Sequence, residues 1–310
     1  MGVKSALLSP DRVTVERWAW ASVVANTVIV LTGGLVRLTG SGLGCPSWPR
    51  CTDESFVPHR ELGIHGVIEF GNRMLTYALV AVAIGTLIAI WRWAGATPFT
   101  RRLAVVLALG IPFQGVIGGI TVLTDLNPWI VSLHLLLSMA LIVGSVLLVV
   151  RVRPEAATPV PARSVALSQV TFAVLVVVVY LGTMVTGSGP HAGDASSPRN
   201  GLDPHVMSHV HAAGVYVLLA LTLATIVVLR GTAAVRFAFL LLAVELLQVT
   251  IGLVQYLTDL PVALVAAHLV GAAILVASGA RLVLAVRSAA KVDERPLATQ
   301  SGDSASTQLR

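Results

Sequence analysis

One sequence occurs twice in this chain, as Gln114-Gly-Val-Ile-Gly-Gly-Ile-Thr-Val-Leu-Thr-Asp-Leu-Asn-Pro-Trp-Ile-Val-Ser-Leu-His134 and as Gln248-Val-Thr-Ile-Gly-Leu-Val-Gln-Tyr-Leu-Thr-Asp-Leu-Pro-Val-Ala-Leu-Val-Ala-Ala-His268. The copies align without a gap at an offset of 134 residues, with the glutamine, one glycine, Leu-Thr-Asp-Leu and the final histidine in register. A shorter motif, Thr39-Gly-Ser-Gly42, returns as Thr186-Gly-Ser-Gly189. Self-similarity at a fixed period indicates a repeat architecture, so we predict a tandem duplication.

The duplicated chain is too apolar to be a water-soluble protein. Of its 310 residues, 55% are hydrophobic and 12% are charged, against about 25% charged in an average soluble domain. Runs of about 20 apolar residues, the length that crosses a bilayer, cover residues 17–36, 64–90, 103–123, 129–150, 165–185, 209–229, 235–256 and 262–284. We predict eight transmembrane helices, the first an uncleaved anchor because it lacks a small-residue cleavage site.

Basic residues gather on one side of this topology. The 21 Lys and Arg exceed the 15 Asp and Glu, which gives a net charge of +6. With both termini in the cytoplasm, 16 of the 21 basic residues lie in inner segments, and only Arg50, Arg60 and Arg199 lie in outer ones. The positive-inside rule thus predicts a multi-pass cell-membrane protein with cytoplasmic N- and C-termini. Topology explains the positive charge, so we expect no nucleic-acid partner.

The repeat and the helix count together predict the domain organisation. Residues 1–155 and 160–290 carry four helices each and are separated by a linker with three prolines. An even number of helices gives both units the same orientation, related by an axis along the membrane normal. Residues 291–310 are polar and are expected to form a disordered cytoplasmic tail. The predicted fold is an all-α integral membrane protein built from two tandem, parallel-related four-helix bundles.

The eight histidines all fall in the outer half of the predicted topology. His134 and His268 occupy the same place in the two copies, and the second unit also has His211 on its second helix. Four-helix bundles hold haem between imidazoles that face each other in the core. A lone histidine near a helix end is more often an interfacial residue, but repetition favours metal or haem ligation. Zinc is disfavoured because no unit gathers three or four close ligands.

A polar stripe follows the second predicted helix of the first unit, where His65, Glu69, Asn72 and Arg73 have helical spacing. A carboxylate within a membrane span is costly and usually faces a site or a partner. Two interpretations are open, because Glu69 either serves a reactive site or forms only an i,i+4 ion pair with Arg73. The second unit has Ser208 at the matching position. We infer one reactive site, in the first unit, and one cofactor site, in the second.

The two cysteines, Cys45 and Cys51, lie in the first outer loop. Two thiols exclude a metal site built from four cysteines, and disulfides persist on the outer side of a membrane. We predict a disulfide between them, which restricts the loop by roughly 2 kcal/mol in the chain-entropy model. Its role is open between a structural staple, a redox pair and a clamp above the first-unit site.

The sequence resembles the heme A synthase family over nearly its whole length apart from the tail. The most specific segments are Thr39-Gly-Ser-Gly-Leu-Gly-Cys-Pro-Ser-Trp-Pro-Arg-Cys51, Ile68-Glu-Phe-Gly-Asn-Arg73, the two Leu-Thr-Asp-Leu segments, and His134 and His268. The resemblance implies an oxidoreductase that converts the C8 methyl of heme O to the formyl of heme A, for cytochrome oxidase. It also implies a bound heme b with axial ligands His211 and His268, and a loop cysteine pair matching Cys45 and Cys51.

The first unit departs from the family pattern at one position. The family motif is similar to Glu-x-x-His-Arg, and Glu69 and Arg73 match it, but Asn72 stands where the histidine is expected. The resemblance therefore implies Glu69 as the catalytic residue, with His134, Asn72 and Arg73 in the site that binds heme O. His65 lies on the same helix face, about 10 Å away along the axis. Either it supplies the missing imidazole or His134 alone ligates the substrate iron.

The same resemblance implies partners and leaves two other classes to compare. The partners are the heme O substrate, the lipid membrane, heme O synthase and cytochrome oxidase assembly factors, and a homo-oligomer is left open. A di-haem electron-transfer cytochrome and a haem transporter built from parallel repeats fit the same composition. The one-sided Glu69, the cysteine loop and the family motifs favour the enzyme. A cytochrome that relays electrons across the membrane would need histidines near both faces.

Overall fold

The computed structural model describes residues 9–154 and 158–293 of the chain, with side chains to residue 290. Within this part the fold is helical throughout, with a short 3-10 helix η1 (Arg60–Leu62) and eight long helices: α2 (Arg12–Leu38), α3 (Gly63–Arg92), α4 (Pro98–Leu123), α5 (Pro128–Val152), α6 (Arg163–Ser188), α7 (Pro204–Val228), α8 (Val235–Leu257) and α9 (Val262–Asp293). All eight are long and apolar enough to cross a membrane. The prediction of an all-α integral membrane protein with eight spans is confirmed.

Capping residues and prolines set several helix starts. Side-chain oxygens accept a backbone N–H of the first turn, which satisfies one of the donors that a helix start leaves open, at Asp11, Thr97, Asn127 and Asp203. Helix α7 begins at Pro204 and not near residue 209 as predicted, so His205, expected in or near an outer loop, lies in the first turn of the helix. Helix α9 continues to Asp293, three residues into the predicted tail. The rest of that tail, 294–310, lies outside the described residues.

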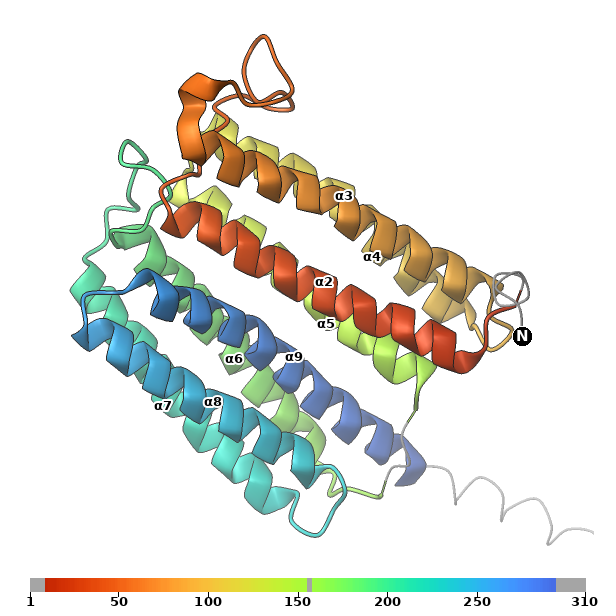
Figure 1. Ribbon diagram of the computed structural model, residues 1–310. Helices are drawn as coiled ribbons and strands as arrows, with labels where there is room; N and C mark the ends of the chain where they lie inside the picture. The colour runs from red at the N-terminus through yellow and green to blue at the C-terminus, as the bar shows by residue number, and fades with distance from the viewer. Residues whose placement is uncertain (1–8, 155–157, 294–310) are drawn as a thin grey trace, which may run out of the picture.

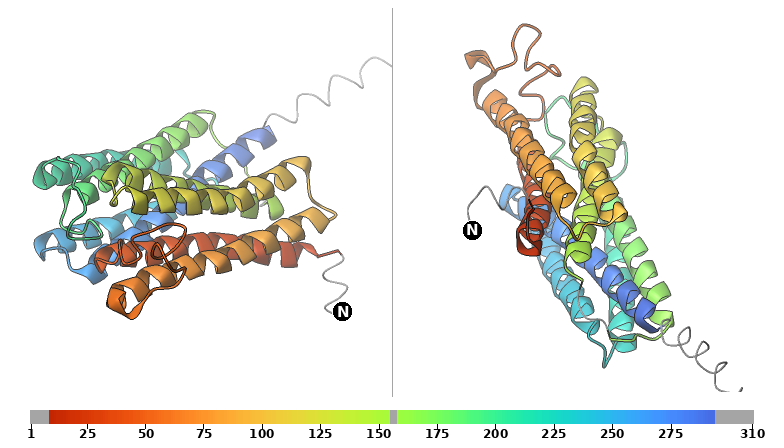
Figure 2. Two further views of the ribbon diagram at one scale, coloured as in Figure 1. Left: turned by 90° about the horizontal axis from the view of Figure 1, so that it is seen from above. Right: turned by 90° about the vertical axis from the view of Figure 1, so that its right-hand side faces the viewer.

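The helices form two groups of four, α2–α5 and α6–α9 (Figure 1). Contacts join α2 to α3, α3 to α4, α4 to α5 and α5 to α2, and the same ring of contacts joins α6, α7, α8 and α9. Helix α9 also packs against α2 and α5. In both views of Figure 2 the helices run side by side. This arrangement is consistent with the tandem bundles that the repeat predicts.

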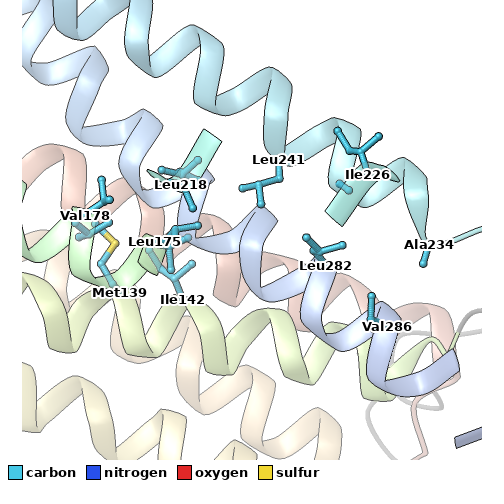
Figure 3. Packing of buried hydrophobic residues seen from close by; sticks show 14 of the residues in the cluster. Met139, Ile142, Leu175, Val178, Leu218, Ile226, Ala234, Leu241, Leu282 and Val286 are labelled. Atoms are coloured by element: carbon cyan, nitrogen blue, oxygen red, sulfur yellow. The ribbon is translucent and has the colours of Figure 1, made fainter. Parts of the chain in front are cut away.

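A buried apolar cluster crosses the boundary between the two groups (Figure 3). Met139 and Ile142 of α5 pack in it together with Leu175 of α6 and Leu241 of α8. Many large apolar side chains remain on the outer faces of the helices, where the solvent is hydrocarbon. Lipid tails are as apolar as leucine, so helix association in a membrane depends on close packing. This shared core fixes the two bundles against each other.

The fold places the repeated histidines at equal depth. His134 is the sixth residue after Pro128, the start of α5, and His268 is the sixth after Val262, the start of α9. Six residues span about 9 Å of helix. His211 is the seventh residue after Pro204 in α7, about 10 Å into its helix. All three imidazoles therefore lie at one level of the membrane domain, near the same end of the bundles.

Candidate functional site

In the second bundle, His211 has one ring nitrogen fixed by the backbone. Its Nδ1 lies 3.0 Å from the backbone oxygen of Val178 on α6. A carbonyl only accepts hydrogen bonds, so Nδ1 carries a proton, and in the neutral ring Nε2 keeps its lone pair. Metal-bound histidines commonly donate their second N–H in this way. The ring also lies against Gly182, where an added Cβ would come within 3.3 Å of Cε1.

His268 on α9 lies against α8 in a similar way. An added Cβ at Gly252 would come within 3.3 Å of its Cε1 and 3.8 Å of its Nδ1. This Nδ1 is buried without a hydrogen-bond partner. His211 and His268, which the sequence predicts as a ligand pair, thus lie at similar depths in the same bundle, each against a glycine of a neighbouring helix.

His134 on α5 occupies the corresponding place in the first bundle. An added Cβ at Gly118 of α4 would come within 3.4 Å of its Cε1, and its Nδ1 is buried without a partner. Gln114 Nε2 donates to the backbone oxygen of His134 at 3.1 Å and to the Ser138 hydroxyl at 2.7 Å. On α3, the Oδ1 atom of Asn72 is also buried without a partner. Asn72 therefore presents a free amide oxygen where the family motif has an imidazole.

Ten buried side-chain polar atoms have no hydrogen-bond partner in the part of the chain that the structure describes. Three of them are Nδ1 of His134, Nδ1 of His268 and Oδ1 of Asn72, at positions that the sequence predicts to hold haem. Folded proteins rarely leave such atoms unsatisfied, so these three fit a bound group. Imidazoles backed by glycines, where any larger side chain would intrude, fit haem iron, with two rings in the second bundle and one in the first.

Glu69 and Arg73 hold the loop between α2 and α3 against α3. Glu69 is 4% exposed. Its Oε1 accepts from Nη2 of Arg73 at 2.6 Å, and its Oε2 accepts from the backbone N–H of Cys45 at 2.6 Å. Arg73 also donates to the backbone oxygens of Cys45, Ser47 and Arg50 at 3.0, 3.1 and 2.9 Å. The i,i+4 ion pair is therefore present. It also holds the loop through hydrogen bonds to the loop backbone.

The loop held by this pair contains the Cys45–Cys51 disulfide, which confirms that prediction. Both cysteines are fully buried. Between them, Trp48 lies against Gly119 of α4, where an added Cβ would overlap the indole. Gly119 adjoins Gly118, the glycine beneath His134. The loop therefore reaches from α3 to the edge of the histidine pocket, a geometry that favours a clamp above the first-unit site.

His65 has different neighbours. It is exposed near the start of α3, and its Nδ1 lies 2.9 Å from the Ser41 hydroxyl. It lines a hollow of about 410 Å³ together with Asp194 from the loop between α6 and α7. Hydrogen bonds from Ser196 lower the pKa of the Asp194 carboxyl, and the charge of His65 adds a smaller effect in the same direction. Within the described residues no hydrogen bond links His65 to His134, so its role as a ligand stays a prediction.

Arg37, at the end of α2, joins the two bundles at this face. Its Nε donates to the backbone oxygen of His191 at 2.5 Å, and its Nη2 donates to that of Thr186 at 2.9 Å. The sequence placed Arg37 within or at the end of a helix and assigned it no role. The signal that could have found its role is position, because Arg37 precedes the first Thr-Gly-Ser-Gly motif by two residues, and Thr186 opens the second copy.

Known proteins match the chain across both bundles. The family model COX15-CtaA, described as cytochrome oxidase assembly protein, matches residues 16–279. The heme A synthase of Shewanella oneidensis is 27% identical over 300 residues, covering 82% of this chain and 91% of that protein. The heme A synthase of Rhizorhabdus wittichii is 25% identical over 330 residues, covering 89% and 94%. The heme A synthase of Listeria monocytogenes (EGD-e) is 32% identical over 132 residues, covering 42% and 43%. The chain therefore belongs to the heme A synthase family of cytochrome oxidase assembly proteins, COX15-CtaA.

Proposed function

We propose that this protein is a heme A synthase, an oxidoreductase that oxidises the C8 methyl of heme O to the formyl group of heme A. Family membership supports an enzyme of heme A formation. The observation that carries the finer proposal is the difference between the two bundles. The first bundle has one of the repeated histidines, a buried Glu69–Arg73 pair and a disulfide loop, and the second bundle has His211 and His268 and no such loop.

In this proposal heme O is the substrate of the first bundle. His134 ligates its iron, and Asn72 and Arg73 complete the surroundings of the ring. His65 is the second candidate ligand, as the sequence suggested. Oxidation of a methyl to an aldehyde releases protons, and Glu69 is the carboxylate placed to accept them. Arg73 orients that carboxylate through the contacts at Oε1, and the Cys45 N–H orients it at Oε2.

The second bundle is proposed to hold heme b between His211 and His268. When bound, heme b supplies one-electron transfer. The Val178 carbonyl fixes the His211 ring so that Nε2 is left for iron, and Gly182 and Gly252 leave space beside the two imidazoles. The protein's contribution at this site is thus ligand orientation, which second-shell hydrogen bonds commonly provide.

The setting of the enzyme completes the proposal. The chain is a multi-pass membrane protein, and we propose the cell membrane, with both termini in the cytoplasm and both haem sites toward the outer face. Heme O synthase is the proposed supplier of the substrate, and cytochrome oxidase assembly factors are the proposed recipients of the product. Self-association into a homo-oligomer is compatible with the apolar outer faces.

Pigment analysis tests the proposed function. The full-length protein is expressed in a host that makes heme O and lacks heme A synthase, and extracted haems are identified by mass. We expect heme A in the membranes and heme b in the purified protein. Heme b in both bundles without heme A would identify an electron-transfer cytochrome. Heme O bound but never oxidised, under aerobic conditions, would identify a carrier.

A further inference from the structure

Glu245 is a buried carboxyl in the middle of α8 that the proposed reaction does not use. It is 2% exposed. Its Oε1 accepts a hydrogen bond from the Thr222 hydroxyl of α7 at 2.7 Å, and its Oε2 is buried without a partner. Among the described residues no salt bridge reaches it. Ionisable groups inside membrane bundles are costly and usually serve a function.

Glu245 shares one face of α8 with the groups around His268. Gln248 follows it by three residues, has a buried Nε2 without a partner, and packs where a Cβ on Gly271 of α9 would overlap its amide. Gly252, which lies against the His268 ring, follows Glu245 by seven residues. Positions i, i+3 and i+7 lie on one side of a helix. Seven residues span about 10 Å, so Gln248 lies between the carboxyl and the imidazole.

The first bundle has no such group. The repeat offset pairs Glu245 with Ile111, which is 2% exposed in α4, while the glutamine and the glycine are kept in both copies. In the first bundle, which is not proposed to hold heme b, an apolar side chain therefore fills this position. Glu245 is also the one acidic residue within the helices between residues 163 and 290. The carboxyl is specific to the bundle proposed to hold heme b.

We propose that Glu245 is a proton-binding site coupled to the oxidation state of heme b. The proposal rests on the proposed function, since it requires heme b between His211 and His268. When a one-electron donor reduces ferric to ferrous iron, the bundle gains one negative charge. Uptake of one proton by the Glu245 carboxylate, which becomes a carboxylic acid, cancels that charge. Charges at this separation interact strongly in an interior from which water is excluded.

Other titratable groups on the surrounding helices are few. Up to residue 290 they are His205, His209, His211 and Tyr216 on α7, Arg236 and Tyr256 on α8, His268, Arg281 and Arg287 on α9, and Arg163 and Tyr180 on α6. His211 and His268 are the proposed iron ligands, and the tyrosines, His205 and His209 are exposed. The arginines stay charged at any working pH. Arg281 has its guanidinium over the Phe237 ring, 3.9 Å from the centroid. Glu245 is thus the group whose charge can change with heme b reduction.

Redox titration of heme b in the purified full chain at several pH values tests this coupling. We expect the midpoint potential to fall as pH rises, because a proton is bound on reduction. One proton per electron corresponds to a tenfold change per pH unit, about 59 mV, and partial coupling gives a smaller slope. Glu245→Gln keeps an oxygen for Thr222 but binds no proton, so it should lose most of the slope. Glu69→Gln, the same change in the other bundle, should keep it.

Infrared difference spectra of the wild-type protein give a second readout. Reduction should produce a carboxylic-acid C=O band that shifts in deuterated water and is missing in Glu245→Gln. If Glu245→Gln loses its haem, the coupling is tested by the carboxylic-acid band of the wild-type protein and by the shift of that band in Glu245→Asp. A haem-loaded wild type without a pH-dependent potential or carboxyl band would overturn the coupling, as would an undiminished slope in Glu245→Gln. A wild type that holds no heme b at His211 and His268 would overturn the proposed function as well, and haem analysis separates the two failures.

Discussion

His134 and His268 lie at the same depth in two copies of one helix pair, yet the residues around them differ. Each ring is backed by a glycine of the preceding helix, and each copy keeps a glutamine four residues before that glycine. On the neighbouring helix, the second bundle presents His211 and the first presents Asn72. The two copies therefore share the glycine and the glutamine next to one imidazole, and they differ at the residue on the neighbouring helix.

The first helix of each bundle also differs at one aligned position. In the second bundle, Gly182 of α6 gives His211 room. Aligned on the Thr-Gly-Ser-Gly motifs, the first bundle has Leu35 in place of this glycine. At these aligned positions the first bundle therefore has neither the imidazole nor the glycine, and it has the Glu69–Arg73 ion pair instead.

The largest effect should come from the carboxylate that only the first pocket has. Glu69→Gln should abolish heme A formation while leaving the heme b spectrum intact, because the substitution removes a proton acceptor in one bundle only. The glutamine can still accept from the Cys45 N–H, so the loop should keep its disulfide. Haem extraction with mass analysis measures the product. Glu61→Gln, an exposed carboxyl in η1, is the matched control and should stay active. Heme A formation in Glu69→Gln would remove the proposed catalytic role.

The second effect concerns the ligand pair of the other pocket. His211→Ala or His268→Ala should remove most of the low-spin heme b absorbance, because each variant loses one axial imidazole. His209→Ala is the matched control, since His209 lies on another face of α7, is exposed, and packs against the tilted ring of His205 with ring centroids 4.4 Å apart. Optical spectra of the purified variants decide. Unchanged spectra in both ligand variants would assign the haem to another site.

The sequence predicted those features of the two bundles that depend on local patterns of residues. Apolar runs located all eight helices, and the in-register repeat located His134 and His268. The cysteine pair followed from its place in an outer loop. Sequence periodicity could not supply contacts between distant segments, such as Arg37 with the His191 carbonyl, 154 positions away. Nor did it show that Arg73 binds the loop backbone, because those acceptors are carbonyls that every residue carries.

The start of α7 shows a second limit. His205 and Ser208 interrupt the apolar pattern just after the Asp203 cap and the proline that begin the helix, so the sequence placed His205 in or near an outer loop. Glu245 lies within the predicted span 235–256 and carries the same signal as Glu69, a carboxylate in a membrane helix, which the sequence interpretation left unused. Its neighbours in sequence are apolar, and its burial beside Thr222 depends on how α7 and α8 pack.

The third effect tests the residue nearest to the lost imidazole. We expect His65→Ala to lose more than the 10–100-fold that removal of an outer partner of a metal ligand usually costs, if His65 ligates the substrate iron. Asn72→His should keep some activity, because it restores the family ligand. The rate of heme A formation measures both. A His65→Ala enzyme within tenfold of wild type would leave His134 as the single imidazole and His65 as a residue of the outer hollow.

A smaller effect should come from the disulfide, which has no counterpart in the second bundle. Cys45 and Cys51 should resist thiol labelling in freshly isolated membranes until reductant is added, because both are bonded and buried. Free labelling without reductant would contradict the bridge. Replacing both with serine should destabilise the loop by roughly 2 kcal/mol. Limited proteolysis of the loop between α2 and α3 measures this, with the loop between α6 and α7 as the internal reference.

The smallest effect compares the two glycine cradles directly. Gly252→Ala places a methyl 3.3 Å from Cε1 of His268, and Gly118→Ala places one 3.4 Å from Cε1 of His134. At such distances the ring has to give way by a few tenths of an ångström, whereas alanine favours a helix over glycine by about 1 kcal/mol. We therefore expect both variants to fold, with thermal stability close to that of the wild type.

The readouts of these two variants should separate by bundle. Gly252→Ala should shift the heme b absorbance and weaken haem retention several-fold, because the displaced imidazole no longer faces iron along its lone pair, and it should leave the His134 pocket unchanged. Gly118→Ala should leave the heme b spectrum unaltered and slow heme A formation. If both variants change the same haem signal, the two pockets are not independent, and the assignment of one bundle to substrate and the other to cofactor fails. If neither changes any signal, the glycines serve helix packing and not the haems.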